Sequence, residues 1–178
     1  MRLFLALSLI SFSVLAQPPT PRKAPELTII EGSGKQTLLS SYRGKVVALA
    51  FILTTCPHCQ AECQVLTKLQ GELGAKGFQP IAVAFNENAQ YLVSPFVQNL
   101  HITFPVGYAK ERQTVTDFLQ ADDSKPWNVP QIILIDRKGM IQAQSAPQGT
   151  PELQEENSLR KLITDMLSGL KPTWQKGS

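Results

Sequence analysis

The chain has 178 residues, enough for about one domain at roughly 100 to 200 residues per domain. Apolar residues make up 43% and charged residues 17%, which excludes a disordered chain, a coiled coil and a multi-span membrane protein. The formal net charge is +3, and because the basic residues are scattered along the sequence without interleaved aromatics, we expect no nucleic-acid partner.

The N-terminal residues have the features of a signal peptide. Arg2 precedes an apolar run that begins at Leu3, and small or aliphatic residues follow at 14–16. We therefore predict a signal peptide over 1–16, with cleavage before Gln17, and a periplasmic or otherwise extracytoplasmic protein. The apolar run is shorter than the roughly 20 residues of a spanning helix, so we expect membrane attachment only if the leader is retained.

The segment after the leader is rich in proline, which favours an extended spacer over packed structure. We predict a Pro-rich linker over 17–25, one folded domain over 26–172 and a C-terminal tail over 173–178.

The first predicted elements form a hairpin and a buried strand. Residues 27–30 and 37–39 flank the turn residues Gly32 and Gly34, a pattern typical of a short β-hairpin. Residues 46–53 are an almost unbroken apolar run, which predicts a central strand buried on both faces. A helix follows this strand and is expected to stop at Gly74 and Gly77.

The rest of the chain alternates in the same way. Pro95 is expected to restart the helix at 91–100, because proline is tolerated only in a first turn. The last helix is predicted to have Thr150 as its N-cap and Pro151 as its first residue. Together these patterns indicate an α/β domain with a mixed central sheet flanked by helices on both faces. The further predictions are strands at 78–85, 104–108, 131–136 and 140–145 and helices at 91–100, 111–119 and 151–170.

The sequence Cys56-Pro57-His58-Cys59 lies where the predicted central strand meets its helix. Unpaired N–H groups and the macrodipole at a helix start favour an anion, here a Cys56 thiolate. Pro57 fits the first helical position, and the two-residue spacing lets Cys59 pair with Cys56. Cys56 is thus the predicted nucleophile and Cys59 the resolving thiol. A protonated His58 adds positive charge beside the thiolate and makes the disulfide a stronger oxidant.

This motif predicts thiol-disulfide exchange with protein thiols or disulfides and requires no cofactor. A purely structural disulfide and a metal site are the alternatives. Besides this tetrad, three longer segments of the sequence are characteristic enough to compare with known families. They are FILTTCPHCQAEC, TFPVGYAKERQTVTDF and NVPQIILIDRKGMI.

These segments resemble the thioredoxin-like proteins of the TlpA/ResA and redoxin group over residues 26–170, and the CPHC tetrad is similar to that of the DsbA disulfide oxidases. The resemblance implies a thioredoxin-like fold in which Val129 and Pro130 form the substrate loop, with a cis peptide bond before Pro130. It also implies that Glu62 lies near the cysteine pair, where it raises thiol pKa values or shuttles a proton. The alternative for Glu62 is an exposed helix glutamate.

The direction of exchange stays open at this point. His58 and an oxidising compartment favour an oxidase, whereas the resemblance to TlpA/ResA favours a reductant recharged by a membrane redox partner.

Several residues depart from the family pattern. Thr55 replaces the tryptophan that usually precedes the first cysteine, and the connection at 121–128 is longer than usual, so Trp127 either lines a docking groove or only packs. A thiol peroxidase of the redoxin group is expected to carry threonine and proline where Leu53 and Leu49 stand, which weakens that alternative.

Cys63 makes the number of cysteines odd. Its spacing from Leu66 predicts a small buried hydrophobe on the helix. Alternatively, Cys59 and Cys63 form a CXXXC pair like that of the SCO-type copper chaperones. Their third ligand is a late histidine, but no histidine follows His101 here, and His101 is expected to lie away from the site. We therefore assign no metal ligands and keep metal binding as the alternative function.

Overall fold

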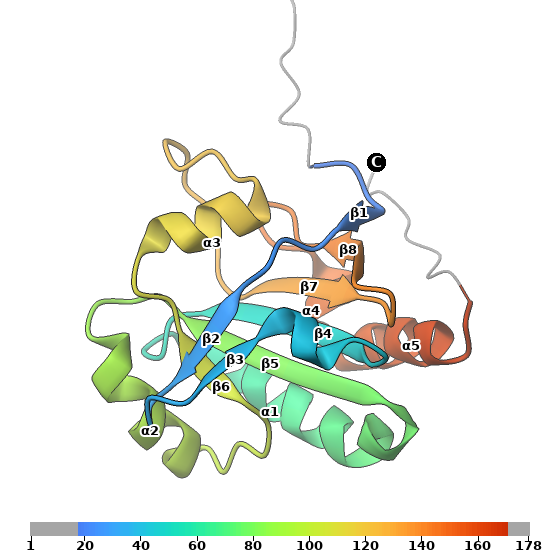
Figure 1. The fold of residues 1–178 in the computed structure, drawn as a ribbon, viewed down its shortest axis with the longest axis horizontal. Coiled ribbons are helices and arrows are strands. Elements are labelled where there is room, and N and C mark those ends of the chain that lie inside the picture. The colour runs from blue at the N-terminus through green and yellow to red at the C-terminus, as the bar shows by residue number, and fades with distance from the viewer. Residues whose placement is uncertain (1–17, 171–178) are drawn as a thin grey trace, which may run out of the picture.

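The computed structural model describes residues 18–170, which form a central mixed sheet between layers of helices (Figure 1). The predicted signal peptide at 1–16 and tail at 173–178 lie outside the described residues. Hydrogen bonds join the strands in the order β1-β8-β7-β4-β5-β6-β2-β3. The strands are β1 (Arg22–Lys23), β2 (Thr28–Glu31), β3 (Gln36–Leu38), β4 (Val46–Ile52), β5 (Phe78–Ala84), β6 (Val106–Tyr108), β7 (Gln131–Ile135) and β8 (Met140–Gln144).

Side chains of β4 alternate between two cores, because successive residues of a strand point to opposite faces. Ala48 and Ala50 face a core covered by the helices that follow β4, β5 and β8, while Leu49 and Phe51 face a second core under the helix that follows β6 and the β2–β3 hairpin. All of β4 is buried between parallel β5 and antiparallel β7. The predicted hairpin, central strand and two-sided cover are confirmed. The helices are η1 (Leu39–Tyr42), α1 (Pro57–Leu73), η2 (Gly74–Lys76), α2 (Ala89–Asn99), α3 (Arg112–Leu119), α4 (Pro151–Gln154) and α5 (Glu156–Leu167).

Pro80 lies inside β5, where a missing N–H normally costs a hydrogen bond. The N–H of Ala82, two residues further on, donates to the carbonyl of Pro105 at 3.1 Å, so position 80 faces the same edge of the strand. Pairing with β6 begins only at Ala82, opposite Val106. Pro80 therefore gives up no interstrand hydrogen bond.

The sheet begins earlier than Glu26, where we predicted the domain to start. Arg22 and Lys23, inside the predicted linker, pair with β8 as an edge strand. The Arg22 guanidinium donates to the carbonyl of Phe118 at 2.8 Å and to Gln144 Oε1 at 2.7 Å. The proline-rich composition of this segment predicts an extended backbone but does not predict these long-range hydrogen bonds.

Two predicted helices differ in detail. Helix α2 begins at Ala89 and contains Pro95 without a restart, and Tyr91, whose carbonyl loses its partner there, is solvent-exposed. The predicted helix at 151–170 is broken at Glu155, which is extended. The Glu155 carboxylate accepts hydrogen bonds from the N–H groups of Asn157 and Ser158 at 3.3 and 2.9 Å and so caps α5.

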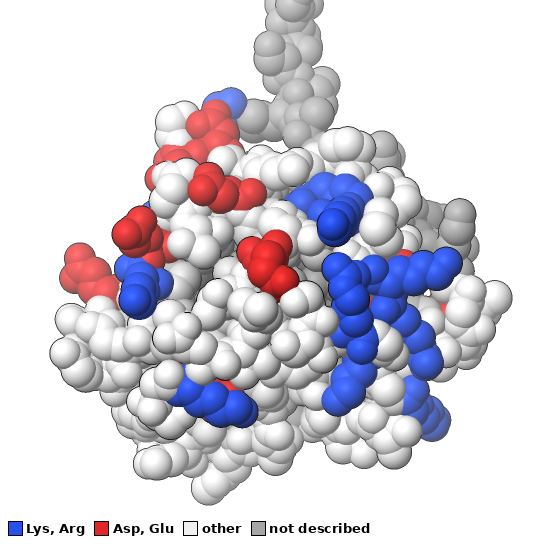
Figure 2. Space-filling view, in the orientation of Figure 1, with Lys and Arg blue, Asp and Glu red and all other residues white. Residues whose placement is uncertain are grey.

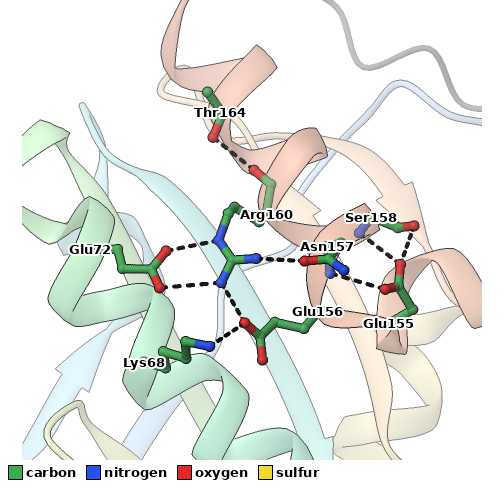
Figure 3. A network of polar contacts seen from close by, with 8 residues as sticks. All are labelled: Lys68, Glu72, Glu155, Glu156, Asn157, Ser158, Arg160 and Thr164. Carbon is green, nitrogen blue, oxygen red and sulfur yellow. Dashed lines mark hydrogen bonds and ion pairs between the residues drawn. The ribbon is translucent and has the colours of Figure 1, made fainter.

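Helix α5 is fastened to α1 by a polar network on the surface (Figure 3). The Arg160 guanidinium contacts both carboxylate oxygens of Glu72, at 2.8 and 3.2 Å, and also bonds Glu156. Lys68 of α1 reaches the same Glu156 at 2.6 Å. Exposed ion pairs of this kind add little stability, but the bidentate geometry fixes the relative position of the two helices.

Candidate active site

The predicted strand-turn-helix junction is present. Strand β4 ends at Ile52, and Cys56 is the N-cap of α1, with Pro57 as the first helical residue. The backbone of Cys56 is extended and its carbonyl accepts the N–H of Gln60 at 3.0 Å, as the N-cap position requires. Cys56 is only partly buried. Its sulfur therefore lies at the helix N-terminus, within reach of solvent.

The turn before Cys56 is held by Asn86 and Gln60, neither of which was predicted as a site residue. The N–H of Thr54 donates to Asn86 Oδ1 at 2.9 Å, and the Gln60 side chain donates to the carbonyl of Thr54 at 3.0 Å. Thr54 follows β4 and Asn86 follows β5. Because these two strands are parallel, both residues lie at the same end of the sheet. A polar residue directly after the neighbouring strand is the sequence feature that would have identified it.

Cys59 and Cys63 are buried in the core, each with 0% of its surface exposed. Cys59 Sγ accepts a hydrogen bond from the N–H of Leu53 at 3.5 Å. Burial, with a further contribution from the neighbouring Cys56 and Glu62, raises the pKa of Cys59 to about 12. Burial likewise raises the pKa of Cys63. Both sulfurs are therefore thiols at neutral pH, and Cys63 is the buried hydrophobe expected from its spacing.

Glu62 is buried, with only 4% of its surface exposed, so its interpretation as an exposed helix glutamate is wrong. Its Oε1 atom has no hydrogen-bond partner among residues 18–170, and burial raises the pKa of the carboxyl to about 8. Its charge also contributes to raising the pKa values of Cys59 and Cys63. Glu62 is thus a titratable group close to both buried thiols.

A cleft of about 600 Å³ brings the other predicted site residues together. It lies between the first turns of α1 and the segment before β7, in which the Val129–Pro130 peptide bond is cis, as the resemblance implied. His58 is solvent-exposed at its rim. The cleft is lined by His58, Ala61, Glu62, Val65, Trp127, Asn128, Val129, Pro130, Gln148 and Gln154.

Trp127 forms one wall of this cleft and also packs against the second core. Its ring stacks on Phe85, with 5.3 Å between centroids, and the Arg112 guanidinium lies 4.5 Å from its centroid. Arg112 is held in turn by Asp123 at 2.8 Å. Trp127 therefore does both: it packs against the second core and lines the cleft beside Val129.

Metal binding gains no support from the geometry. Among residues 18–170 no three side chains of His, Cys, Asp or Glu lie close enough together to hold a metal ion. His101 follows the end of α2 with φ 51° and is exposed, outside the cleft lining. In the same part of the chain, no helix has the length and apolarity needed to span a bilayer.

Comparisons with known proteins identify a family and similar chains. Residues 21–144 match the AhpC/TSA family. The chain is 27% identical over 135 residues to the thiol-disulfide oxidoreductase ResA of Bacillus thuringiensis, covering 76% of this chain and 74% of that protein. It is 29% identical over 123 residues to the thioredoxin-like protein YneN of Bacillus subtilis, covering 68% of each.

A solved structure of similar fold is a thioredoxin-family thiol:disulfide interchange protein from Chlorobium tepidum, with a TM-score of 0.68 and 22% identity. The superposition covers 84% of this chain and 99% of that one. The predicted thioredoxin-like fold is therefore confirmed.

Proposed function

The chain belongs to the AhpC/TSA family, and we propose that it is a thiol-disulfide oxidoreductase that exchanges disulfides with proteins through Cys56 and Cys59. The observation that carries the proposal is the asymmetry of the two sulfurs. Cys56 is accessible at a helix N-terminus, whereas Cys59, one turn further on, is fully buried with a pKa raised to about 12 by burial. One sulfur is placed to meet a partner and the other to react only with its neighbour.

The exchange proceeds in two steps. The Cys56 thiolate attacks one sulfur of a substrate disulfide, and the other substrate sulfur leaves as a thiolate that takes up a proton. Cys59 then loses its proton and attacks the Cys56 sulfur, which releases the second substrate thiol and leaves a Cys56–Cys59 disulfide. The same steps in reverse donate the disulfide to a dithiol. In either direction two electrons pass between the protein and its substrate.

We assign Glu62 to the proton transfer in the second step. Because burial raises the pKa of Cys59 to about 12, its thiol reacts slowly unless a base removes the proton. The Glu62 carboxyl, whose pKa burial raises to about 8, is a group near this thiol that exchanges protons close to neutral pH. Its orphan Oε1 atom is free to accept such a proton, directly or through a water.

The cis-proline loop is the proposed docking site for the substrate. Among residues 18–170 neither the N–H nor the C=O of Val129 forms a hydrogen bond, so both are available to an extended peptide. Asn128 and Pro130 on either side are fixed, since their carbonyls accept the side-chain amides of Gln131 and Gln154. A rigid loop with free backbone groups suits a substrate recognised by its main chain.

We place this activity outside the cytoplasm. The composition of residues 1–16 supports export, and an oxidising compartment is where protein disulfides persist. We further propose that exchange runs in the reducing direction. A thiolate stabilises the reduced pair and so makes the disulfide a stronger oxidant. His58 contributes little to this stabilisation, because it is exposed and solvent screens its charge. The buried Glu62 opposes it, because its carboxylate disfavours negative charge on Cys59.

The proposal is tested by measuring disulfide exchange, hydroperoxide turnover and copper content of the purified protein. We expect it to accelerate the reduction of insulin disulfides by a small dithiol and to show no comparable rate with a hydroperoxide. Hydroperoxide turnover faster than disulfide exchange would assign it to the peroxidases of its family instead. Stoichiometric copper in the protein, without insulin or glutathione exchange, would identify it as a metal-binding protein.

A further inference from the structure

Basic residues that are scattered along the sequence come together at one end of the sheet. Lys45 immediately precedes β4, Lys76 lies just before β5, and Arg137 and Lys138 form the β7–β8 turn. Figure 2 shows Lys and Arg gathered at the right of the molecule, the side on which Figure 1 draws α5, while most Asp and Glu of this face lie to the left. We call this group the basic end. It consists of Lys23, Arg43, Lys45, Lys76, Arg137 and Lys138.

Backbone contacts show that these segments are neighbours. The N–H of Gly44 donates to the carbonyl of Arg137 at 2.9 Å, and Arg43 bonds the carbonyl of Lys138. The Arg137 guanidinium donates to the carbonyls of Lys76 and Leu167 at 3.3 and 3.4 Å. Lys23 lies opposite Met140 in the β1–β8 pair, next to the same turn. The sheet topology therefore builds the basic end from segments far apart in sequence.

The six cations of the basic end are only partly offset by carboxylates within the described part of the chain. None of its residues forms an ion pair there, whereas the lysines and arginines elsewhere that do so include Lys68, Arg112 and Arg160. Glu26 and Asp136 line one hollow with Lys23 and Arg43. Both carboxylates also accept backbone N–H groups, Asp136 from Lys138 and Met140 and Glu26 from Ser40. The excess of cations is therefore available to an external anion.

An exposed apolar side chain accompanies these cations. Leu170, after the end of α5, has 61% of its surface exposed and shares a hollow of about 290 Å³ with Arg137, Lys138 and Met166. Cations with an apolar side chain among them are typical of surfaces that bind anionic bilayers, where the cations meet the headgroups and the apolar group enters the interface.

We propose that the basic end binds the surface of an anionic lipid bilayer. Cys56 follows the opposite end of β4, and the strand's seven residues at about 3.3 Å each separate it from the basic end by about 20 Å. Docking through the basic end thus turns the cleft and Cys56 away from the lipid and leaves them accessible to proteins. This surface goes beyond the proposed exchange activity and does not depend on it.

The test compares the full chain with two triple variants on lipid vesicles. The first variant is Lys23→Gln, Lys76→Gln and Lys138→Gln, chosen because these ammonium groups form no hydrogen bond within residues 18–170, so that their loss leaves the fold intact. The matched control removes the same charge elsewhere, by Lys35→Gln, Lys110→Gln and Lys125→Gln. Since all three proteins carry the same N-terminus, any difference between them reports the altered surface.

Co-sedimentation is measured with phosphatidylcholine vesicles, alone and with about 30% phosphatidylglycerol, at low and high salt. We expect the unaltered chain to prefer the anionic vesicles, and the basic-end variant to bind them at least about tenfold more weakly, while the control retains most of its binding. High salt should remove the preference. Equal loss in both variants, or no preference for anionic vesicles, would overturn the proposal. Retention of the unaltered chain by poly-glutamate but not by anionic vesicles would also overturn it, because the face would then fit an acidic protein.

Discussion

Replacing Cys56 by serine is expected to lower kcat/KM for insulin reduction by roughly a thousandfold or more, because a serine hydroxyl is a poor nucleophile at neutral pH and forms no mixed disulfide. Cys63→Ser should retain most of the activity. Cys63 is a buried thiol whose pKa is raised by burial, and it packs in the core under the helix. Each variant loses one sulfur, so a difference in their activities reflects which cysteine is replaced and not how many thiols remain.

The folded state of both variants is checked by their circular dichroism and unfolding midpoints. Cys63→Ser places a hydroxyl in an apolar site and is expected to cost some stability without a matching loss of rate. Similar loss of kcat/KM in two folded variants would contradict the assigned roles. It would show that Cys63, and not only the Cys56–Cys59 pair, takes part in exchange.

The second large effect concerns Glu62 and pH. Burial raises the pKa of its carboxyl in the folded protein to about 8, whereas the ordinary value of the unfolded chain is 4.5. Between these values the folded state holds a proton that the unfolded state has released, so the unfolded state binds fewer protons. The free energy of unfolding must therefore fall as pH rises from about 5 toward 8. The stabilisation by protonated Glu62 is fully present below pH 4.5 and is lost as the pH rises through about 8.

The size of this effect is a few kcal/mol. One pKa unit corresponds to about 1.4 kcal/mol, so we expect a decrease on the order of 2–4 kcal/mol between pH 5 and pH 8.5, seen as a lower urea midpoint. Glu62→Gln has no proton to lose and should flatten this dependence. Glu152→Gln, an exposed glutamate at the start of α4, is the matched control and should keep it. An unchanged pH dependence in Glu62→Gln would show that another group is responsible.

The same variant separates stability from chemistry. If the Glu62 carboxylate accepts the Cys59 proton, Glu62→Gln slows resolution of the mixed disulfide most above pH 8, where the Glu62 carboxyl is ionised, and least at pH 5, where it is protonated and as neutral as the amide. Stability alone does not predict that loss of rate.

Local sequence was sufficient for the parts of the fold with strong periodicity. The apolar run of β4, the proline and cysteine at the start of α1, and the turn residues of the β2–β3 hairpin each specify an element by themselves. The cis bond before Pro130 came from the family resemblance and not from local sequence, which allows a trans proline at the start of a strand equally well.

Features that depend on distant neighbours were not predictable in this way. Glu62 shares a helix face with Cys59 and Leu66, and the resemblance placed it near the cysteine pair, but its place in the cleft beside Trp127 follows only from tertiary packing. Asn86 holds the turn before Cys56 across two strands. The basic end exists only because the β7–β8 turn lies beside the starts of β4 and β5. In each case the tertiary contact decides the role of the residue.

We propose that Cys56 and Cys59 form one redox couple in which Cys63 takes no part. It is tested most directly by titrating the protein in glutathione or dithiothreitol buffers, alkylating the free thiols and mapping the disulfide by mass spectrometry. We expect a single two-electron transition, more negative than about −180 mV, in which the oxidised protein carries a Cys56–Cys59 bond and a free Cys63. A bond between Cys59 and Cys63, or Cys56 still free in the fully oxidised protein, would contradict it.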